Sequence, residues 1–253
     1  MRFEGKRILL TGGSGGIGAL VARRMRNEGG RVAILDRAAP EPGFDYLAAD
    51  LATPQGLEEA AQAVSGEDWD VLINLAGIQH FGPVEAQSPE HLTASYMVNL
   101  VAPVRLTQAV LPSMKRRRCG QIVNIGSIFG SINFAHFASY SSAKAGLRGF
   151  SQALRREVAG SRIGVTYIAP RAVRTPLNSA AVLEFARLTH MNMDEPRCIA
   201  RRITGAIRSD RREVYFGFPE SLFVRLNAIA PGLVDGALAA NDRKAAALFQ
   251  SAS

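Results

Sequence analysis

Short, continuously apolar segments that alternate with longer helical patterns constrain the fold of this chain more than any other feature. Because these segments are rich in Val, Ile and Leu and carry no alternating polar residues, they predict strands buried on both faces of a parallel sheet. The predicted strands are residues 7–12, 31–36, 70–77, 121–127 and 163–170, with weaker edge strands at 44–50 and 213–217. Helices are predicted at 16–29, 54–65, 89–118, 138–160 and 195–209. This order predicts an α/β fold, a doubly wound parallel sheet of about seven strands with helices on both faces.

We interpret the chain of 253 residues as one domain, because no internal repeat and no low-complexity linker divides it. Residues 1–217 contain the predicted sheet, and residues 218–253 form a C-terminal helical extension packed on the same domain. Two short helices are expected in this extension, interrupted at Pro231 and Gly232. They would cover the core or a subunit interface, and a peripheral membrane contact is the alternative.

Composition narrows the classes of partner. The net charge is +8, carried mostly by arginine, which leaves open an acidic carrier protein or an anionic lipid surface. The basic run at 115–118 lacks interleaved aromatic residues, so nucleic acid is not expected. No apolar stretch reaches the roughly 18 residues that a membrane span needs. Two cysteines that form no metal-ligand cluster, together with the absence of a signal sequence, predict a cytoplasmic protein without a bound metal.

The first predicted strand leads into the glycine-rich loop TGGSGGIG, residues 11–18, and a predicted helix follows. Glycines allow a tight turn and a close approach of the backbone to a pyrophosphate, and the helix amino terminus offers free N–H groups to that anion. The spacing fits either Gly12, Gly16 and Gly18 or Gly13, Gly15 and Gly18. In this strand–loop–helix context, the loop predicts a dinucleotide site.

The end of the second predicted strand bears on the choice of dinucleotide. The Asp36 carboxylate would accept hydrogen bonds from the adenosine ribose and repel a 2′-phosphate, which favours NAD. Arg37 argues the other way, because its guanidinium could pair with that phosphate, so NADP stays possible.

Tyr140 and Lys144 lie four residues apart, at neighbouring positions on one face of a predicted helix. The pKa of tyrosine is ordinarily near 10, and a neighbouring ammonium group favours the phenolate. We therefore expect the pKa of Tyr140 to be lowered, so that this residue acts as a general acid or base.

Asp50, the segment 74–77, Asn99 and Ser127, which lies thirteen residues before Tyr140, complete an ordered set of motifs. With the glycine loop and the Tyr140–Lys144 pair, this set resembles the short-chain dehydrogenase/reductase family over residues 6 to about 217. The resemblance implies a Rossmann-like NAD(P)-dependent oxidoreductase that forms homodimers or homotetramers through the helices predicted at 89–118 and 138–160.

The resemblance also implies roles for individual residues. The implied catalytic residues are Asn99, Ser127, Tyr140 and Lys144. The implied cofactor-binding residues are Thr11, Gly12, Ser14, Gly16, Ile17, Gly18, Asp36, Arg37, Asp50, Leu51, Asn74, Ala76, Gly77, Tyr140, Lys144, Pro170, Val173 and Thr175. The residues expected to contact the substrate are Ser127, Phe129, Phe134, Phe137, Tyr140 and Arg171.

Arg171 departs from the family pattern, in which glycine is usual at this position. Its side chain either is accommodated structurally or enters the substrate site and pairs with an acidic group. His136, four residues before Tyr140, is expected at the rim of the pocket.

The segment between Ser127 and Tyr140 and the predicted lid at 176–193 are mostly apolar. They favour an oxidoreductase that acts on a hydrophobic secondary alcohol or ketone. An NADPH-dependent 3-oxoacyl-thioester reductase, acting on a carrier protein or coenzyme A thioester, is the first alternative. A non-catalytic dinucleotide-binding scaffold or sensor is the second.

Overall fold

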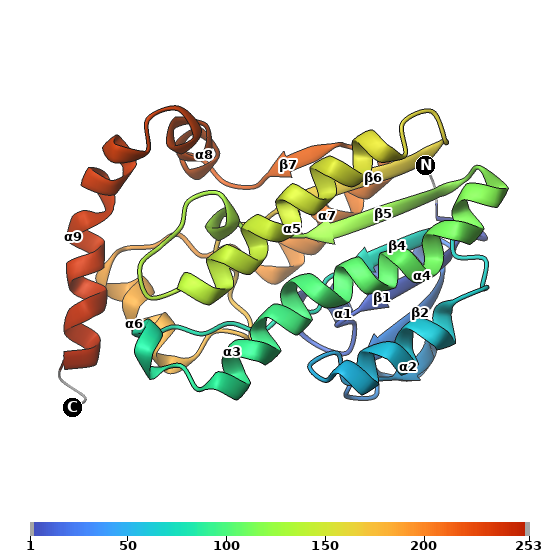
Figure 1. Cartoon of the computed structure of the whole chain (residues 1–253), viewed down its shortest axis with the longest axis horizontal. Coiled ribbons are helices and arrows are strands. Elements are labelled where there is room, and N and C mark those ends of the chain that lie inside the picture. The colour runs from blue at the N-terminus through green and yellow to red at the C-terminus, as the bar shows by residue number, and fades with distance from the viewer. Residues whose placement is uncertain (1–2, 251–253) are drawn as a thin grey trace.

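A computed structural model describes residues 3–250 and contains the predicted parallel sheet, in the strand order β3-β2-β1-β4-β5-β6-β7 (Figure 1). The strands are β1 (Arg7–Thr11), β2 (Arg31–Asp36), β3 (Asp45–Ala48), β4 (Val71–Asn74), β5 (Gly120–Ile125), β6 (Ile163–Ala169) and β7 (Glu213–Tyr215). The helices are α1 (Gly16–Asn27), α2 (Pro54–Val64), α3 (Pro89–Tyr96), α4 (Ala102–Arg117), α5 (Ala138–Glu157), α6 (Ala180–Leu188), α7 (Pro196–Arg208), α8 (Glu220–Ile229) and α9 (Pro231–Gln250). The predicted α/β fold is confirmed.

Helices cover both faces of the sheet, as the continuously apolar strands require. One core cluster joins the sheet to α2, α4 and α5, and a second joins its other face to α1 and α7. The strand order reverses at β1, which pairs with β2 on one side and with β4 on the other. Because ligands of doubly wound sheets bind where the order reverses, the carboxyl ends of β1 and β4 are the expected position of a site.

The segment predicted as one helix at 89–118 is interrupted by a π-helical turn at Met97–Val101. Helix α3 begins at Pro89 after Ser88, whose hydroxyl accepts the N–H of His91, and α4 continues beyond the turn. Asn99 lies inside this turn and is completely buried. Single π-helical turns are frequent at functional sites, which agrees with a role for Asn99.

Leu147, Phe150, Leu154 and Val158 form an apolar stripe at helical spacing on α5 and its C-cap, and this stripe faces the sheet of its own protomer. Leu147, Leu154 and Val158 are buried, and Leu154 and Val158 belong to the core cluster that contains α2 and α4. This stripe is therefore used within the protomer, and an oligomer stays a prediction.

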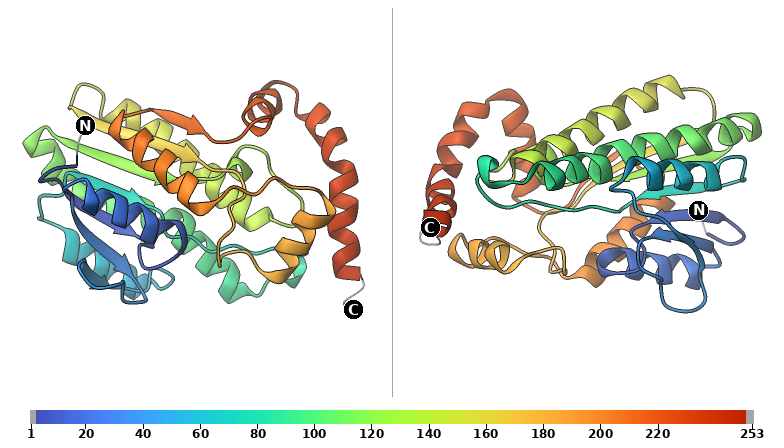
Figure 2. Two further views of the ribbon diagram at one scale, coloured as in Figure 1. Left: turned by 180° about the vertical axis from the view of Figure 1, so that it is seen from behind. Right: turned by 60° about the horizontal axis from the view of Figure 1, so that its bottom comes forward.

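The C-terminal helices lie at one end of the molecule, where α9 runs alongside α6 (Figures 1 and 2). The prediction of two short helices was wrong for α9, which has 20 residues. Pro231 begins this helix, where the missing N–H of proline costs no hydrogen bond. The sequence also missed helix α6 inside the predicted lid. The division of the chain at residues 217 and 218 stays a prediction.

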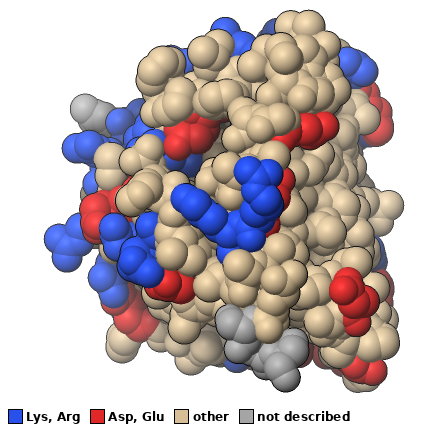
Figure 3. All heavy atoms as spheres, turned by 90° about the vertical axis from the view of Figure 1, so that its left-hand side faces the viewer, with Lys and Arg blue, Asp and Glu red and all other residues tan. Residues whose placement is uncertain are grey.

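Apolar side chains of these last helices are divided between the interior and the surface. Val224, Val234 and Ala245 are buried, whereas Ile229 and Leu233 are 84% and 67% exposed. Wide areas of this end of the molecule carry neither acidic nor basic side chains (Figure 3). Within residues 3–250, no helix is both long enough and apolar enough to cross a lipid bilayer.

Candidate active site

The loop between β1 and α1 forms an anion-binding turn at the carboxyl edge of the sheet. Gly12 has a φ angle of +71°, and a Cβ atom there would lie 2.7 Å from the Cα of Ala76, so only glycine fits. A Cβ atom on Gly18 would lie 1.9 Å from the carbonyl oxygen of Gly12, because α1 packs directly on the turn. Gly15, the N-cap residue of α1, has no side chain to cap the helix. The first N–H groups of α1 are therefore available to an anion.

Asp36 lies beside this turn with its carboxylate fixed. Its Oδ2 atom accepts the N–H of Ser14 at 3.0 Å, and its Oδ1 atom accepts the N–H of Ala38 at 3.3 Å. Arg37 lines the same cavity, is exposed, and forms no ion pair with residues 3–250. Asp36 and Arg37, the two residues expected to decide between NAD and NADP, thus both line this cavity.

Thr11 and Asn74 position the loops beneath the cavity without lining it. The Thr11 Oγ1 atom accepts the N–H groups of Leu75 and Ala76 at 3.0 and 3.1 Å, which fixes the start of the loop after β4. The Asn74 Nδ2 atom donates to the Asn124 Oδ1 atom at 2.8 Å between neighbouring strands. These buried contacts hold Ala76 and Gly77 against the glycine turn.

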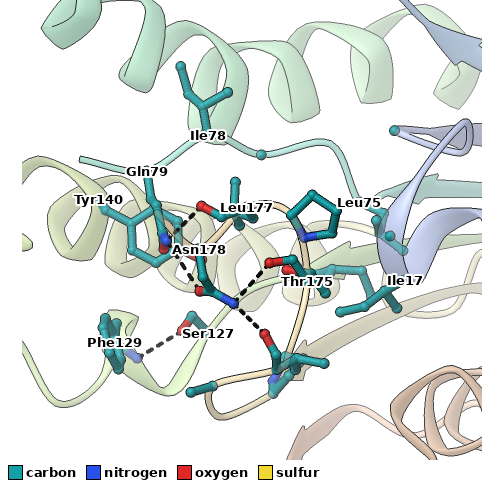
Figure 4. A pocket seen from close by; sticks show the side chains of 18 of the residues that line it. Ile17, Leu75, Ile78, Gln79, Ser127, Phe129, Tyr140, Thr175, Leu177 and Asn178 are labelled. Carbon is teal, nitrogen blue, oxygen red and sulfur yellow. Dashed lines mark hydrogen bonds between the residues drawn. The ribbon is translucent and has the colours of Figure 1, made fainter. Parts of the chain in front are cut away.

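Three of the predicted catalytic residues come together at the floor of the cavity. Ser127 follows β5, and its Oγ atom accepts the N–H of Phe129 at 3.1 Å (Figure 4). A hydrogen bond also links Ser127 to Tyr140 on α5. The Lys144 Nζ atom lies 5.8 Å from the centre of the Tyr140 ring and donates to the carbonyl oxygen of Ile125 at 3.0 Å.

Burial sets the protonation of this group. Burial raises the pKa of Tyr140 to about 12, and the hydrogen bond with Ser127 opposes that rise. Burial also lowers the pKa of Lys144 to about 8. The expectation of a lowered tyrosine pKa is therefore wrong for the protein by itself, because removal from water disfavours the charged form of both residues. At neutral pH, Tyr140 carries its proton and can donate it.

Asn99 approaches the same place from the π-helical turn. Its Nδ2 atom donates to the carbonyl oxygens of Ile78 and Ser95, at 2.7 and 2.9 Å, whereas its buried Oδ1 atom has no partner. A Cβ atom built on Gly77 would lie 3.0 Å from that Oδ1 and 3.7 Å from the Lys144 Nζ atom. The space beside Gly77 is thus bordered by an acceptor and a donor, which suits a bridging water molecule.

The cavity has a volume of about 550 Å³ and extends from the glycine turn to the lid. Besides Asp36 and Arg37, its lining includes the predicted residues Gly12, Gly16, Ile17, Ala76, Gly77, Ser127, Phe129, Phe137, Tyr140, Lys144, Pro170, Arg171, Val173 and Thr175. At the lid end the lining is apolar, with Ile78, Leu177, Val182, Met191 and Met193.

Gln79 and Asn178 fasten the lid over the cavity, and the sequence did not reveal either residue. The Gln79 Nε2 atom donates to the Leu177 carbonyl oxygen at 3.0 Å, and the Asn178 Nδ2 atom donates to the Val173 carbonyl oxygen at 2.6 Å (Figure 4). Gln79 and Asn178 are 99 residues apart, so no local pattern connects them. The sequence predicted only the lid itself, from its apolar composition and its two methionines.

Arg171 extends toward α8. Its Nη2 and Nε atoms donate to Asp194 at 2.8 and 3.1 Å, and its Nη1 atom donates to both carboxylate oxygens of Glu220 at 3.2 Å. These two bonded carboxylates raise the pKa of Arg171. The contacts favour structural accommodation over the pairing of Arg171 with an acidic substrate, since its charge is already balanced.

Several predicted residues lie outside the cavity lining. Asp50 accepts the N–H of Ala52 through its side chain, and Leu51 is buried in the core. Phe134 lines a neighbouring cavity and stacks on Phe129, with ring centres 4.4 Å apart. His136 packs against Phe249 of α9, at 5.0 Å between ring centres. The cofactor contacts expected of Asp50 and Leu51 and the substrate contact expected of Phe134 stay predictions.

These features fit a nicotinamide dinucleotide. The uncapped amino terminus of α1 suits a pyrophosphate, the Asp36 carboxylate suits ribose hydroxyls, and Lys144 lies near the predicted proton donor, Tyr140. Together, the doubly wound sheet, the glycine turn and this group of side chains define a dinucleotide-dependent oxidoreductase.

Comparison with known proteins identifies the family. The short chain dehydrogenase family matches residues 6–184, and the chain belongs to this family of NAD(P)-dependent enzymes. The 3-oxoacyl-(acyl-carrier-protein) reductase FabG of Escherichia coli is 35% identical over 193 residues, which cover 71% of this chain and 78% of the relative. The corresponding reductase of Vibrio cholerae is 32% identical over 221 residues, covering 80% and 90%.

A mammalian relative and a solved structure extend the similarity beyond the matched segment. Dehydrogenase/reductase SDR family member 7B of Bos taurus is 32% identical over 265 residues, covering 94% of this chain and 81% of the relative. The crystal structure of a short chain dehydrogenase from Burkholderia cenocepacia in complex with NADP has a TM-score of 0.80 at 24% identity, covering 94% and 99%. At that identity the structure supports the fold alone.

Proposed function

We propose that this protein interconverts a hydrophobic secondary alcohol and the corresponding ketone. One observation carries the proposal: Ser127, Tyr140 and Lys144 meet at the floor of a cavity whose lid end is apolar. A substrate that presents one oxygen to Ser127 and Tyr140 would contact Phe129, Phe137 and the lid with the rest of its surface. Apolar lining with a few placed polar groups is the usual composition of a site for such a molecule.

The bound nicotinamide would supply or accept the hydride. In the direction of reduction, Tyr140 donates its hydroxyl proton to the substrate oxygen, where negative charge develops. The Ser127 hydroxyl, which accepts the N–H of Phe129 and bonds to Tyr140 in the free protein, would donate its proton to the same substrate oxygen. Lys144 stabilises the phenolate left on Tyr140, and the space beside Gly77 and Asn99 offers a route for its reprotonation. Oxidation reverses each transfer.

We infer a preference for NAD, because the fixed Asp36 carboxylate lies where it would repel a 2′-phosphate. The exposed guanidinium of Arg37 offsets part of that repulsion. Replacing Asp36 with alanine should therefore weaken NADH binding and strengthen NADPH binding. Calorimetric titration of wild type and Asp36→Ala with both reduced cofactors measures the two changes. Tighter binding of NADPH than NADH by the wild type would contradict the inference.

Reduction of a 3-oxoacyl thioester is the second candidate, favoured by the FabG relatives and by the net charge of +8, which suits an acidic carrier protein. A panel of hydrophobic ketones and acetoacetyl-coenzyme A, each assayed with NADH and NADPH, separates the two candidates. Preference for the thioester with NADPH would support the second. We also propose that the protein forms a homodimer or homotetramer. Light scattering, which measures the molar mass in solution, tests this.

Tyr140→Phe separates chemistry from binding. We expect this variant to bind the cofactor and to lose activity by roughly 10²–10⁴-fold, since the proton donor is gone. Unchanged turnover in Tyr140→Phe would overturn the proposed mechanism. Cofactor binding without turnover of any ketone or thioester by the wild type would support the alternative of a dinucleotide-binding scaffold.

A further inference from the structure

A second cavity, of about 270 Å³, adjoins the catalytic cavity beneath the C-terminal helices. The two cavities share Phe129, Arg171, Ala172 and Met191 in their linings. Phe129 follows Ser127 by only two residues and bonds to it through its N–H. The second cavity, which we call the C-terminal chamber, therefore begins close to the proposed reaction centre.

The lining of the C-terminal chamber selects for apolar, uncharged groups. Twelve of its eighteen lining residues are apolar, and four of these are at least 97% buried: Ile128, Ile132, Phe185 and Val234. The two charged side chains in the lining, Arg171 and Glu220, bond to each other, so they present no unbalanced charge. Burial of apolar surface is the main stabilisation that such a chamber can give a ligand.

The Arg171 contacts determine how the two cavities are divided. By bonding Asp194 and Glu220 together, Arg171 joins the loop after β6 to the end of the lid and to α8. Its charge is held within the protein, and Phe129 and Met191 are the larger apolar side chains common to both cavities. Methionine is flexible and adapts readily to a bound apolar group, so a substrate can pass this boundary at low cost.

We propose that the C-terminal chamber binds the distal aliphatic part of the substrate whose reacting oxygen lies at Ser127 and Tyr140. This inference rests on the proposed function and adds the substrate class, a secondary alcohol or ketone with a long unbranched tail. Six of the eighteen lining residues lie on α8 or α9, outside residues 6–184 that match the family. The chamber thus combines the lid region with the C-terminal extension, beyond the segment that the family model matches.

Steady-state kinetics on a series of secondary alcohols, from butanol to dodecanol, test the proposal. Because each buried methylene contributes roughly 0.8 kcal/mol, about a fourfold change, kcat/KM should rise along the series until the chamber is filled. Ala237→Phe obstructs the chamber from α9, where Ala237 is exposed, so the fold should tolerate the change. Ala240→Phe is the matched control, since Ala240 is exposed on the same helix and does not line the chamber.

Ala237→Phe should reduce kcat/KM for dodecanol by on the order of tenfold or more, while butanol and the control variant change by less than about twofold. An equal ratio of long-chain to short-chain kcat/KM in all three proteins would overturn the proposal.

If NADH binds but no alcohol or ketone is turned over, the proposed function fails, and the chamber is judged by binding alone. Calorimetric titration with secondary dodecanol then decides. Saturable binding by wild type and Ala240→Phe, lost in Ala237→Phe, would support the chamber, whereas equal binding or no binding in all three would refute it.

Discussion

Replacing Lys144 with methionine should stabilise the protein, although it removes a proposed catalytic group. Lys144 is 3% exposed, and burial lowers its pKa from 10.5 to about 8. Since one pKa unit corresponds to about 1.4 kcal/mol, keeping the ammonium charged inside the fold costs about 3 kcal/mol at neutral pH. The substitution leaves the Ile125 carbonyl oxygen without its donor, which costs about 1 kcal/mol. We therefore expect the free energy of unfolding to rise by about 2 kcal/mol.

The pH dependence identifies the cause. Between the folded pKa of about 8 and the ordinary value of 10.5, the unfolded chain holds a proton on Lys144 that the folded protein has released. The wild type therefore gains stability as the pH rises through this interval, and the methionine variant does not. The stability advantage of the methionine variant should therefore shrink as the pH rises above about 8. Near pH 10.5 the wild type should become the more stable protein, because only the lost hydrogen bond still distinguishes the two.

Denaturant unfolding, followed by the fluorescence of the single tryptophan, Trp69, measures this difference at a series of pH values. Lys115→Met is the control, because the Lys115 side chain is 47% exposed and its loss should change stability by less than about 0.5 kcal/mol at neutral pH. A Lys144→Met variant that is less stable than the wild type at neutral pH, by an amount that does not vary with pH, would refute the reasoning.

Two further substitutions test the surroundings of the site. Arg171→Ala leaves two partly buried carboxylates unpaired and should lower the free energy of unfolding by about 1–3 kcal/mol, measured by the same denaturant titrations; wild-type stability would show that the Arg171 contacts contribute nothing. Gly77→Ala places a methyl group between the Asn99 Oδ1 and Lys144 Nζ atoms and should reduce kcat by on the order of tenfold or more, a larger loss than that of NADH affinity, because it displaces the water proposed to return a proton. Equal losses of kcat and of NADH affinity would instead indicate a distorted cofactor site.

The local sequence was sufficient for the sheet and for most of the cavity lining. Continuous apolar runs such as 31–36 and 163–170 predicted buried parallel strands, because a strand covered on both faces has no solvent side to mark with polar residues. The glycine loop was equally readable, since the tight turn restricts residue type at Gly12 whatever the rest of the chain does. Ser127, Tyr140 and Lys144 meet because α5 follows β5 along the chain with only one short helical turn between them, which keeps their spacing informative.

Only the tertiary structure decided the tyrosine pKa, the partners of Arg171 and the C-terminal chamber, because these properties depend on contacts between distant segments and on the exclusion of water. The pattern Tyr140–Lys144 suggested a lowered tyrosine pKa, and burial reverses that direction, because desolvation disfavours the phenolate more strongly than the hydrogen bond with Ser127 favours it. Arg171 finds its carboxylates 23 and 49 residues away, so its identity alone could not distinguish a structural from a substrate contact. The C-terminal chamber exists only where α8 and α9 fold back onto the lid. Sequence patterns report local periodicity and spacing, whereas charge balance, pKa values and cavities arise from contacts that form when distant segments pack together.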